Sequence, residues 1–205
     1  MTRLPRTLLE SPLPGIGRPL TEAEADQFGK YLDLLLKWQK IHRLVGSSHP
    51  GWIIDNIFID SLGFLEALPS GVRRVADIGS GAGVPGIPIA IVRPDLKLSL
   101  IEARRRRVSF LSTVIRELAL THAEVVGARV GALEGSHGGR FDAVVMRCAG
   151  DLTTLLPRAL TLLKSGGAVI TSAGPSQGAV PVGGELLVVQ MPGGGARGFW
   201  RHIKP

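Results

Sequence analysis

The segment 77–88, with the sequence DIGSGAGVPGIP, holds the residues of this chain that are best placed to bind a ligand. Gly79, Gly81 and Gly83 stand at alternate positions directly after a run that predicts a buried strand. Glycine accepts positive φ and has no side chain, so such a loop brings its backbone N–H groups against a bound molecule. Asp77 adds a carboxylate at the carboxyl end of the strand, where open α/β sheets bind ligands. The segment therefore predicts a ligand site whose negative charge suits a cationic group.

Two classes of ligand fit this loop. Residues 81–86 satisfy G-x-G-x-x-G, and Glu102 follows about twenty residues later, where an acid binds ribose hydroxyls, so an NAD-dependent oxidoreductase is one hypothesis. The additional Gly79 and the preceding Asp77 give D-x-G-x-G-x-G, the form associated with S-adenosylmethionine. In that setting Glu102 accepts hydrogen bonds from the ribose, and Asp77 favours the ammonium and sulfonium end. A tight turn without a ligand is disfavoured, because so many glycines weaken a structure that has no use for them.

Composition narrows the class of protein. The 205 residues contain 24 Lys and Arg against 17 Asp and Glu, a net charge of +7, which favours a polyanionic partner such as nucleic acid over a merely soluble surface. The single cysteine, Cys148, excludes an internal disulfide framework, and the five histidines lack ligand spacing, so we expect no metal. No apolar run is long enough to cross a bilayer and no signal peptide is evident, so we expect a cytoplasmic protein.

The elements expected around the loop form three regions: a leader over 1–20, an N-terminal helical cap over 21–70 and a main domain over 71–205. The leader is rich in proline and glycine, so we expect it to be irregular and mobile. In the cap, Thr21 and Glu24 form a capping box that starts an amphipathic helix ending near Lys40. A second helical pattern covers 52–68. The aromatic residues Tyr31 and Trp38 share the leucine spacing of the first helix, which favours core packing over stacking on RNA bases.

The main domain alternates strand and helix patterns. Strands are expected at 74–78, 97–101, 123–126, 143–146, 167–171 and 184–190. Helices are expected at 87–92, 105–120 and 153–164, with a short turn near 130–133. The tail 193–203 predicts a turn and one last edge strand. This alternation predicts a Rossmann-like α/β fold, with a mostly parallel sheet of seven or six strands and helices on both faces.

At these residues the chain resembles a known family, the bacterial 16S ribosomal RNA guanine-N7 methyltransferases called glucose-inhibited division protein B. The extended loop ending V-P-G-I-P and the following Ile91-Val92-Arg93-Pro94 carry most of the resemblance. Supporting matches lie at Leu36 to Lys40, Leu44, Asp60-Ser61, Arg106 to Val108, Phe110-Leu111, Ala128 to Val130, Phe141-Asp142 and Arg147. The similarity covers about residues 21 to 172.

The resemblance implies a class I methyltransferase that transfers a methyl group from S-adenosyl-L-methionine to N7 of a guanine in the decoding-site loop of 16S rRNA. It implies contacts to the methyl donor from the loop, from a segment near the adenine and from the end of the fourth strand. With the acids and loop neighbours considered above, the expected cofactor-binding set is Asp77, Gly79, Ser80, Gly81, Gly83, Val84, Glu102, Arg129, Val130, Gly131 and Arg147. The partner implied is 16S rRNA or a small ribosomal subunit precursor, and we expect a monomer. Another RNA or small-molecule methyltransferase, and a binding module that has lost activity, remain alternatives.

Arg147 is the one catalytic residue that we expect, and the chemistry of guanine N7 calls for no catalytic dyad. N7 already holds a lone pair, so its methylation needs alignment rather than a strong base. Arg147 ends a strand at the ligand-bearing edge, where it would bind the cofactor carboxylate or hold the guanine. A purely structural pairing with Asp77 or Asp151 is the alternative. Cys148 lies near the position of a thiolate nucleophile for cytosine C5, but a lone cysteine beside a buried strand is more often small core filler.

Four consecutive arginines are the expected RNA contacts: Arg104, Arg105, Arg106 and Arg107. Their positive charges are unfavourable beside the dipole at a helix start, and phosphate binding at the substrate edge would explain that electrostatic cost. An ordinary solvated helix start is an equally weighted alternative. The chain also departs from the family pattern. Ile57 replaces a histidine, Cys148-Ala149 follows Arg147 in place of Ala-Phe, and 171–174 replaces a Leu-Lys-Gly type segment. These departures concern the RNA-facing side more than the cofactor side.

Overall fold

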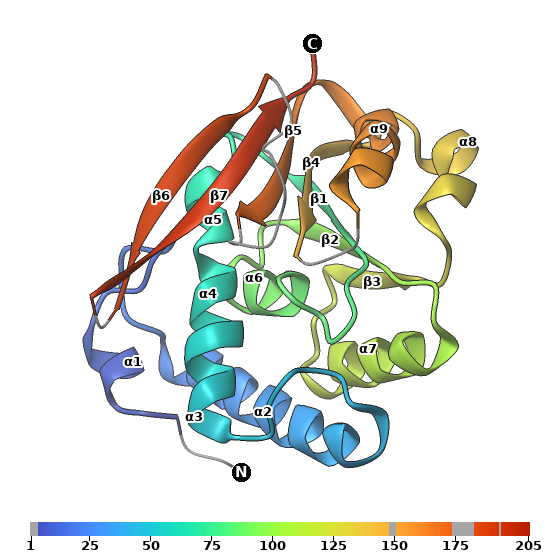
Figure 1. The fold of residues 1–205 in the computed structure, drawn as a ribbon. Coiled ribbons are helices and arrows are strands. Elements are labelled where there is room, and N and C mark those ends of the chain that lie inside the picture. The colour runs from blue at the N-terminus through green and yellow to red at the C-terminus, as the bar shows by residue number, and fades with distance from the viewer. Residues whose placement is uncertain (1–3, 148–150, 174–182, 193) are drawn as a thin grey trace.

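A computed structural model of the protein describes residues 4–147, 151–173, 183–192 and 194–205. It contains a seven-stranded sheet with the order β3-β2-β1-β4-β5-β7-β6 (Figure 1). The strands are β1 (Arg74–Ile78), β2 (Lys97–Ile101), β3 (Ala123–Val126), β4 (Phe141–Met146), β5 (Leu163–Ala173), β6 (Glu185–Met191) and β7 (Gly195–Ile203). Strands β1 to β5 pair in parallel, and β7 runs antiparallel to both of its neighbours. The predicted Rossmann-like fold is confirmed, with seven strands.

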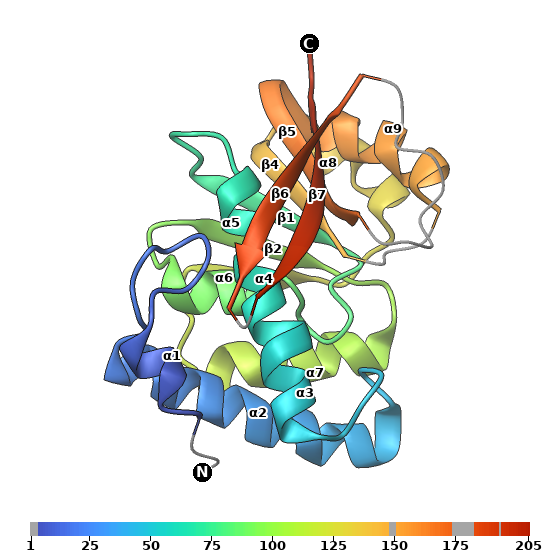
Figure 2. The ribbon, with the colours of Figure 1, turned by 60° about the vertical axis from the view of Figure 1, so that its left-hand side comes forward.

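Helices cover both faces of this sheet. The described helices are α1 (Thr7–Glu10), α2 (Glu22–His42), α3 (Pro50–Ile53), a π-helix (Ile54–Ile59), α4 (Asp60–Leu62), α5 (Phe64–Ala67), α6 (Gly86–Val92), α7 (Arg105–Glu117), a 3₁₀ turn (Val130–Ala132), α8 (Glu134–His137) and α9 (Leu152–Leu162). One buried cluster joins α2, α6, α7 and the column α3 to α5 to one face, and a second joins α9 to the other face (Figures 1 and 2). Successive strand residues alternate between the clusters, as Val144 and Val145 do, because strand side chains point to opposite faces.

The cap helices begin as predicted but contain an irregularity. Thr21 Oγ1 accepts a hydrogen bond from the Glu24 N–H at 3.2 Å, and Glu24 accepts one from the Thr21 N–H at 2.8 Å, which confirms the capping box. The single helix expected over 52–68 instead spans 50–67 with the π-helix in its middle. Helix α7 ends three residues before the predicted position, because Ala119 adopts a positive φ of 52°.

The expectation of a loose leader is wrong for the part that the structure describes. Helix α1 begins at Thr7, and the side chains of Leu8, Leu13 and Leu20 are buried in the main cluster. The Gly15 N–H also donates a hydrogen bond to Glu66 at 2.8 Å. Three leucines spaced through a proline-rich segment therefore fasten it to the column α3 to α5, because each buries apolar surface there.

The C-terminal strand is not the edge strand that the sequence suggested. β7 lies between β5 and β6, with six paired positions along β5 from Ala168 to Ala173. Its Phe199 and Trp200 are buried, one on each face of the sheet, whereas β6 exposes Leu186 and Val188. The large apolar pair favours the interior position, which leaves β6 at the edge. Among the residues that the structure describes, no helix has the length and apolar character needed to cross a membrane.

Candidate active site

The glycine loop joins β1 to α6 at the carboxyl ends of the parallel strands. Gly79, Gly81 and Gly83 have φ of 70°, 58° and 90°, the region that glycine alone adopts readily. The Gly79 N–H donates to the Ile101 carbonyl at 2.9 Å, and the Gly83 N–H donates to the Ser80 carbonyl at 2.7 Å. Gly79 is exposed, whereas Ser80, Gly81 and Gly83 are buried. The loop thus presents bare backbone at one point above the ends of β1 and β2.

Asp77 lies beneath the loop, with its side chain wholly buried. Its Oδ2 accepts a hydrogen bond from the Gly86 N–H at 3.0 Å, and its Oδ1 has no hydrogen-bond partner among the described residues. Burial raises the pKa of this carboxyl group to about 7, although the Gly86 N–H and the Ser80 hydroxyl oppose the shift. A Cβ at Gly86 would lie 2.7 Å from Oδ2 and would collide with Leu100, so only glycine allows this approach. The attraction of Asp77 for a cation stays a prediction, and the carboxyl group that would exert it lies beneath the loop.

Glu102 follows β2 and holds the next part of the site. Its Oε2 accepts from the Gly81 N–H at 3.1 Å, and its Oε1 accepts from the Arg104 N–H at 2.8 Å. Its side chain is only 6% exposed, and Arg107 Nη1 lies 3.6 Å from Oε2. Each oxygen keeps acceptor capacity, because a carboxylate oxygen accepts more than one hydrogen bond. The ribose role of Glu102 stays a prediction, with the carboxylate held between the glycine loop and the start of α7.

The four consecutive arginines divide into two groups. Arg104, Arg105 and Arg106 are exposed, whereas Arg107 is partly buried and its guanidinium lies over Gly81 beside Glu102. Together with the C-terminal end of α2, the four line an open groove of about 520 Å³, whose other residues are Ile41, His42, Arg43 and Leu44. The sequence reading missed His42 and Arg43. The basic residues at the end of α2 were the signal by which the sequence could have indicated them.

The segment expected near the adenine forms the 3₁₀ turn after β3. Val130 is buried, Arg129 is exposed and Gly131 lies between them in exposure. A Cβ at Gly131 would collide with the guanidinium of Arg158, which reaches over from α9. Sequence reasoning missed Arg158, because nothing in a helix sequence shows which strand-end turn it will cover.

Tyr31 supports the loop from below and packs in the core, as predicted. Its hydroxyl donates a hydrogen bond to the Ala82 carbonyl at 2.6 Å, and its ring stacks on Phe58 at 4.9 Å between centroids. Trp38 packs edge-on against Phe110 at 5.4 Å. Tyr31 and Trp38 of α2 therefore both contribute to the core, and Tyr31 ties the cap to the glycine loop.

Tyr31→Phe is expected to lower the free energy of unfolding by about 1–3 kcal/mol, because the buried Ala82 carbonyl loses its donor while the ring packing stays. Urea denaturation measures the change. Trp38→Phe serves as the comparison, because Trp38 is only partly buried and its ring contact survives in that variant. An unchanged midpoint for Tyr31→Phe would show that this hydrogen bond does not hold the loop.

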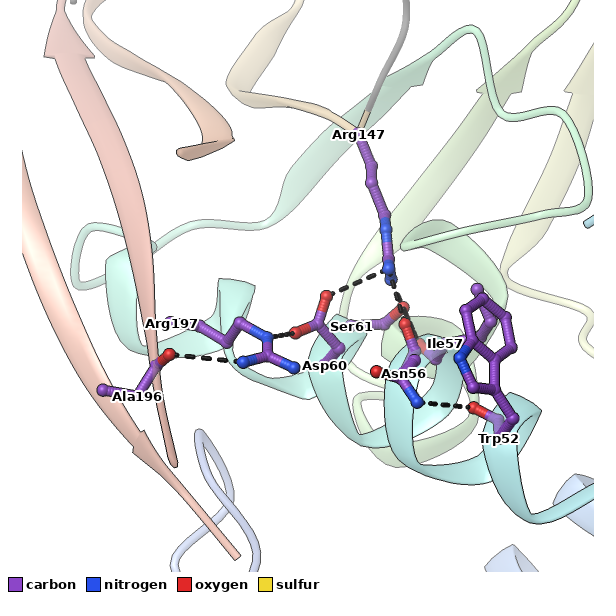
Figure 3. Close-up of polar contacts among 8 residues, drawn as sticks. All are labelled: Trp52, Asn56, Ile57, Asp60, Ser61, Arg147, Ala196 and Arg197. Atoms are coloured by element: carbon purple, nitrogen blue, oxygen red, sulfur yellow. Dashed lines mark hydrogen bonds and ion pairs between the residues drawn. The ribbon is translucent and has the colours of Figure 1, made fainter. Parts of the chain in front are cut away.

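Arg147 leaves the end of β4 and points into the helical cap (Figure 3). Its Nη2 lies 3.1 Å from Asp60 Oδ2 and also donates to the Asn56 carbonyl, and its Nη1 lies 3.5 Å from the Ile57 carbonyl. From the sequence, a structural ion pair of Arg147 with Asp77 or Asp151 is the alternative to a catalytic role. Both partners are wrong, because the carboxylate that contacts Arg147 belongs to Asp60. That contact joins segments far apart in the chain, so no local pattern could reveal it.

The remaining sequence expectations concern the positions that depart from the family pattern and the absence of a metal. Ile57, which stands in place of a histidine, is buried, and its carbonyl accepts a hydrogen bond from Ser61. Thr171 is buried in β5. Cys148 and Ala149, and Gly174 in the other departing segment, lie outside the described residues. The described residues contain no group of three or more His, Cys, Asp or Glu able to hold a metal, and the absence of a metal stays a prediction.

Two solved structures with a similar architecture are methyltransferases. The O-methyltransferase TomG from Streptomyces achromogenes, solved with S-adenosylmethionine, has a TM-score of 0.54 at 17% identity over 91% of each chain. A SAM-dependent methyltransferase from Aquifex aeolicus has a TM-score of 0.54 at 16% identity, over 75% of this chain and 93% of that one. The strand order and the glycine loop at the ends of β1 and β2 therefore define a Rossmann-like α/β fold with the architecture of class I methyltransferases.

Sequence comparison gives the family. The family model described as rRNA small subunit methyltransferase G (GidB) matches residues 24–178, and the chain belongs to this family. Proteins named ribosomal RNA small subunit methyltransferase G are 39% identical in Sorangium cellulosum, over 79% of this chain and 69% of that protein, and 37% identical in Desulfitobacterium hafniense, over 76% and 65%. One from Chromobacterium violaceum is 31% identical over 90% of both chains. The predicted resemblance is confirmed, and the NAD-dependent alternative has no support.

Proposed function

We propose that this protein transfers a methyl group from S-adenosyl-L-methionine to N7 of a guanine in the decoding-site loop of 16S rRNA. The observation that carries the proposal is the glycine loop, whose exposed Gly79 stands with the buried carboxylates of Asp77 and Glu102 at the ends of two adjacent strands. Family membership supports rRNA as the substrate, since the relatives are named as methyltransferases of the small-subunit ribosomal RNA.

The buried acids fit this methyl donor. Glu102 keeps acceptor capacity on both oxygens, which suits the two hydroxyls of a ribose. Asp77 Oδ1 lacks a donor, and its carboxylate is the group most able to stabilise a nearby positive charge from below the loop. When bound, S-adenosylmethionine supplies an electrophilic methyl group on a sulfonium. Gly79, Val84, Val130 and Gly131 would complete its contacts.

The protein's share of the reaction is alignment. Guanine N7 attacks with its own lone pair, so no proton has to be removed. Arg147 ends β4 at the ligand-bearing edge, and its guanidinium is held in one place by the cap. In the proposed mechanism Arg147 binds the donor carboxylate or holds the guanine, and the closed packing of the loop fixes the donor. A rigid pair of reactants lowers the barrier through orientation alone.

The substrate assignment has a direct test. The protein is incubated with S-adenosylmethionine carrying a labelled methyl group and either small ribosomal subunits or naked rRNA, and the modified base is mapped. Label at guanine N7 is the expected result. Label on a cytosine, on a small molecule, on protein or nowhere would contradict the proposal and favour another methyltransferase or an inactive binding module.

The groove between α2 and α7 is proposed to bind the rRNA backbone through Arg104, Arg105 and Arg106. We expect the triple change of these residues to glutamine to weaken rRNA binding and to lower the slope of log affinity against log salt by about 2 to 3, because each phosphate contact contributes about 0.7–0.9. Filter binding at several salt concentrations measures the slope.

Three other exposed arginines give a matched control for that experiment. Arg73 and Arg74 lie at the opposite edge of the sheet, and Arg116 lies at the far end of α7. Their triple change to glutamine removes the same charge without touching the groove. Equal slopes in the two triple variants would show that net charge, rather than the groove, attracts the RNA. We propose further that the enzyme works as a monomer in the cytoplasm, which its mass in solution and its fractionation test.

A further inference from the structure

The π-helix presents backbone acceptors to the catalytic edge of the sheet. A π-helical turn uses i→i+5 hydrogen bonds and so departs from the α-helical pattern of the carbonyl groups. The carbonyls of Asn56 and Ile57, both in this turn, accept from the guanidinium of Arg147. Asp60 follows immediately and places its carboxylate on the same guanidinium at 3.1 Å. Three acceptors from one short segment therefore surround one side chain from β4 (Figure 3).

Asp60 is a buried charge with two cationic partners. Its side chain is 8% exposed, and its Oδ1 lies 2.6 Å from Arg197 Nε while its Oδ2 faces Arg147. Arg197 comes from β7, so the carboxylate joins the cap both to Arg147, which follows β4, and to β7. Burying a carboxylate without partners is costly, and the two arginines compensate that cost here. Because its side chain is enclosed by these contacts, Asp60 acts on a ligand only through its partners.

We infer that Asp60 is a positioning residue, which together with the π-helical carbonyls fixes the Arg147 guanidinium for methyl transfer. This inference rests on the role of Arg147 in the proposed function. An arginine side chain has several freely rotating bonds, and a guanidinium held by a carboxylate and two carbonyls of the cap is confined to one position beside the strand ends. The Arg197 contact holds the carboxylate from its other side.

The test is a double-mutant cycle on kcat. Asp60→Asn keeps the size of the side chain and an acceptor oxygen but removes the charge, and it is expected to lower kcat roughly tenfold through loss of alignment. Asp60→Ala is expected to lower kcat further, with a drop in melting temperature. In the double variant Asp60→Asn/Arg147→Ala, kcat should equal that of Arg147→Ala alone, because the asparagine then has no guanidinium to misplace. The dissociation constants for S-adenosylmethionine and rRNA accompany each kcat.

Glu185→Gln is the matched control, because Glu185 also pairs with an arginine of β7, Arg201, away from the site. Its kcat should stay at the wild-type value. Full kcat in Asp60→Asn, or losses that multiply in the double variant, would overturn the inference, since a merely structural role gives independent effects. If Arg147→Ala is impaired while Asp60→Asn is not, the inference alone fails. If wild-type protein places no label on rRNA, the proposed function fails instead.

Discussion

Arg147→Ala is expected to lower kcat about 100-fold or more while the protein keeps its fold. Arg147 directly follows β4 and its guanidinium is held by the cap, and in an aligned reaction even a misplacement of about 1 Å costs about that factor. The fold should survive because Asp60 retains its shorter contact to Arg197 at 2.6 Å, so the buried carboxylate is not left alone. Steady-state methylation of rRNA measures kcat, and circular dichroism with a melting temperature checks the fold.

The same variant distinguishes the two roles open to Arg147. A weaker affinity for S-adenosylmethionine with an unchanged KM for rRNA would assign the guanidinium to the donor carboxylate, and the opposite split would assign it to the guanine. Arg201→Ala is the control, because Arg201 lies on the hairpin and pairs with Glu185 outside the site. Wild-type turnover in Arg147→Ala would remove this residue from the mechanism.

The first three parallel strands follow from the sequence to the residue, whereas β4 and β5 begin two and four residues before their predicted starts at 143 and 167. β1, β2 and β3 have the predicted bounds, because short apolar runs between turn residues can form little else. The order of the last two strands could not be predicted from local sequence. β7 lies inside the sheet because Phe199 and Trp200 are buried on its opposite faces. The prediction of a mobile leader from its proline and glycine content was wrong for a similar reason. A few buried leucines hold the segment against the core although its backbone is irregular.

The candidate site divides along the same line. The loop glycines Gly79, Gly81 and Gly83 could be predicted from the sequence, because their backbone conformations exclude most other residues. Arg147 could be placed at a strand end from the sequence, but its partner Asp60 could not, since a π-helix at 54–59 sets where that carboxylate points. Single-sequence patterns carry no signal for a π-helical turn, because its apolar spacing differs from that of an α-helix by one residue.

Asp77 should make the stability of the protein depend on pH in an unusual direction. Its folded-state pKa of about 7 lies above the ordinary value of 3.8, so between about pH 4 and pH 7 the native state holds a proton that the unfolded chain has released. The free energy of unfolding therefore falls as pH rises through this window and stays reduced above it, by about 4 kcal/mol at most. Asp77→Asn cannot ionise, so its urea stability should lack this decline and exceed that of the wild type at pH 8.

The same ionisation should control affinity for the methyl donor. Below pH 7 the carboxyl group under the loop is neutral, and it can stabilise a cationic ligand only after losing its proton. Calorimetric affinity for S-adenosylmethionine should thus rise up to tenfold per pH unit between pH 5.5 and 7 in the wild type, whereas Asp77→Asn should bind weakly with a flat profile. The variant keeps all five histidines, so any effect of histidine on the affinity is the same in both proteins and cancels in the comparison. Parallel profiles in the two proteins would show that Asp77 serves the Gly86 hydrogen bond alone.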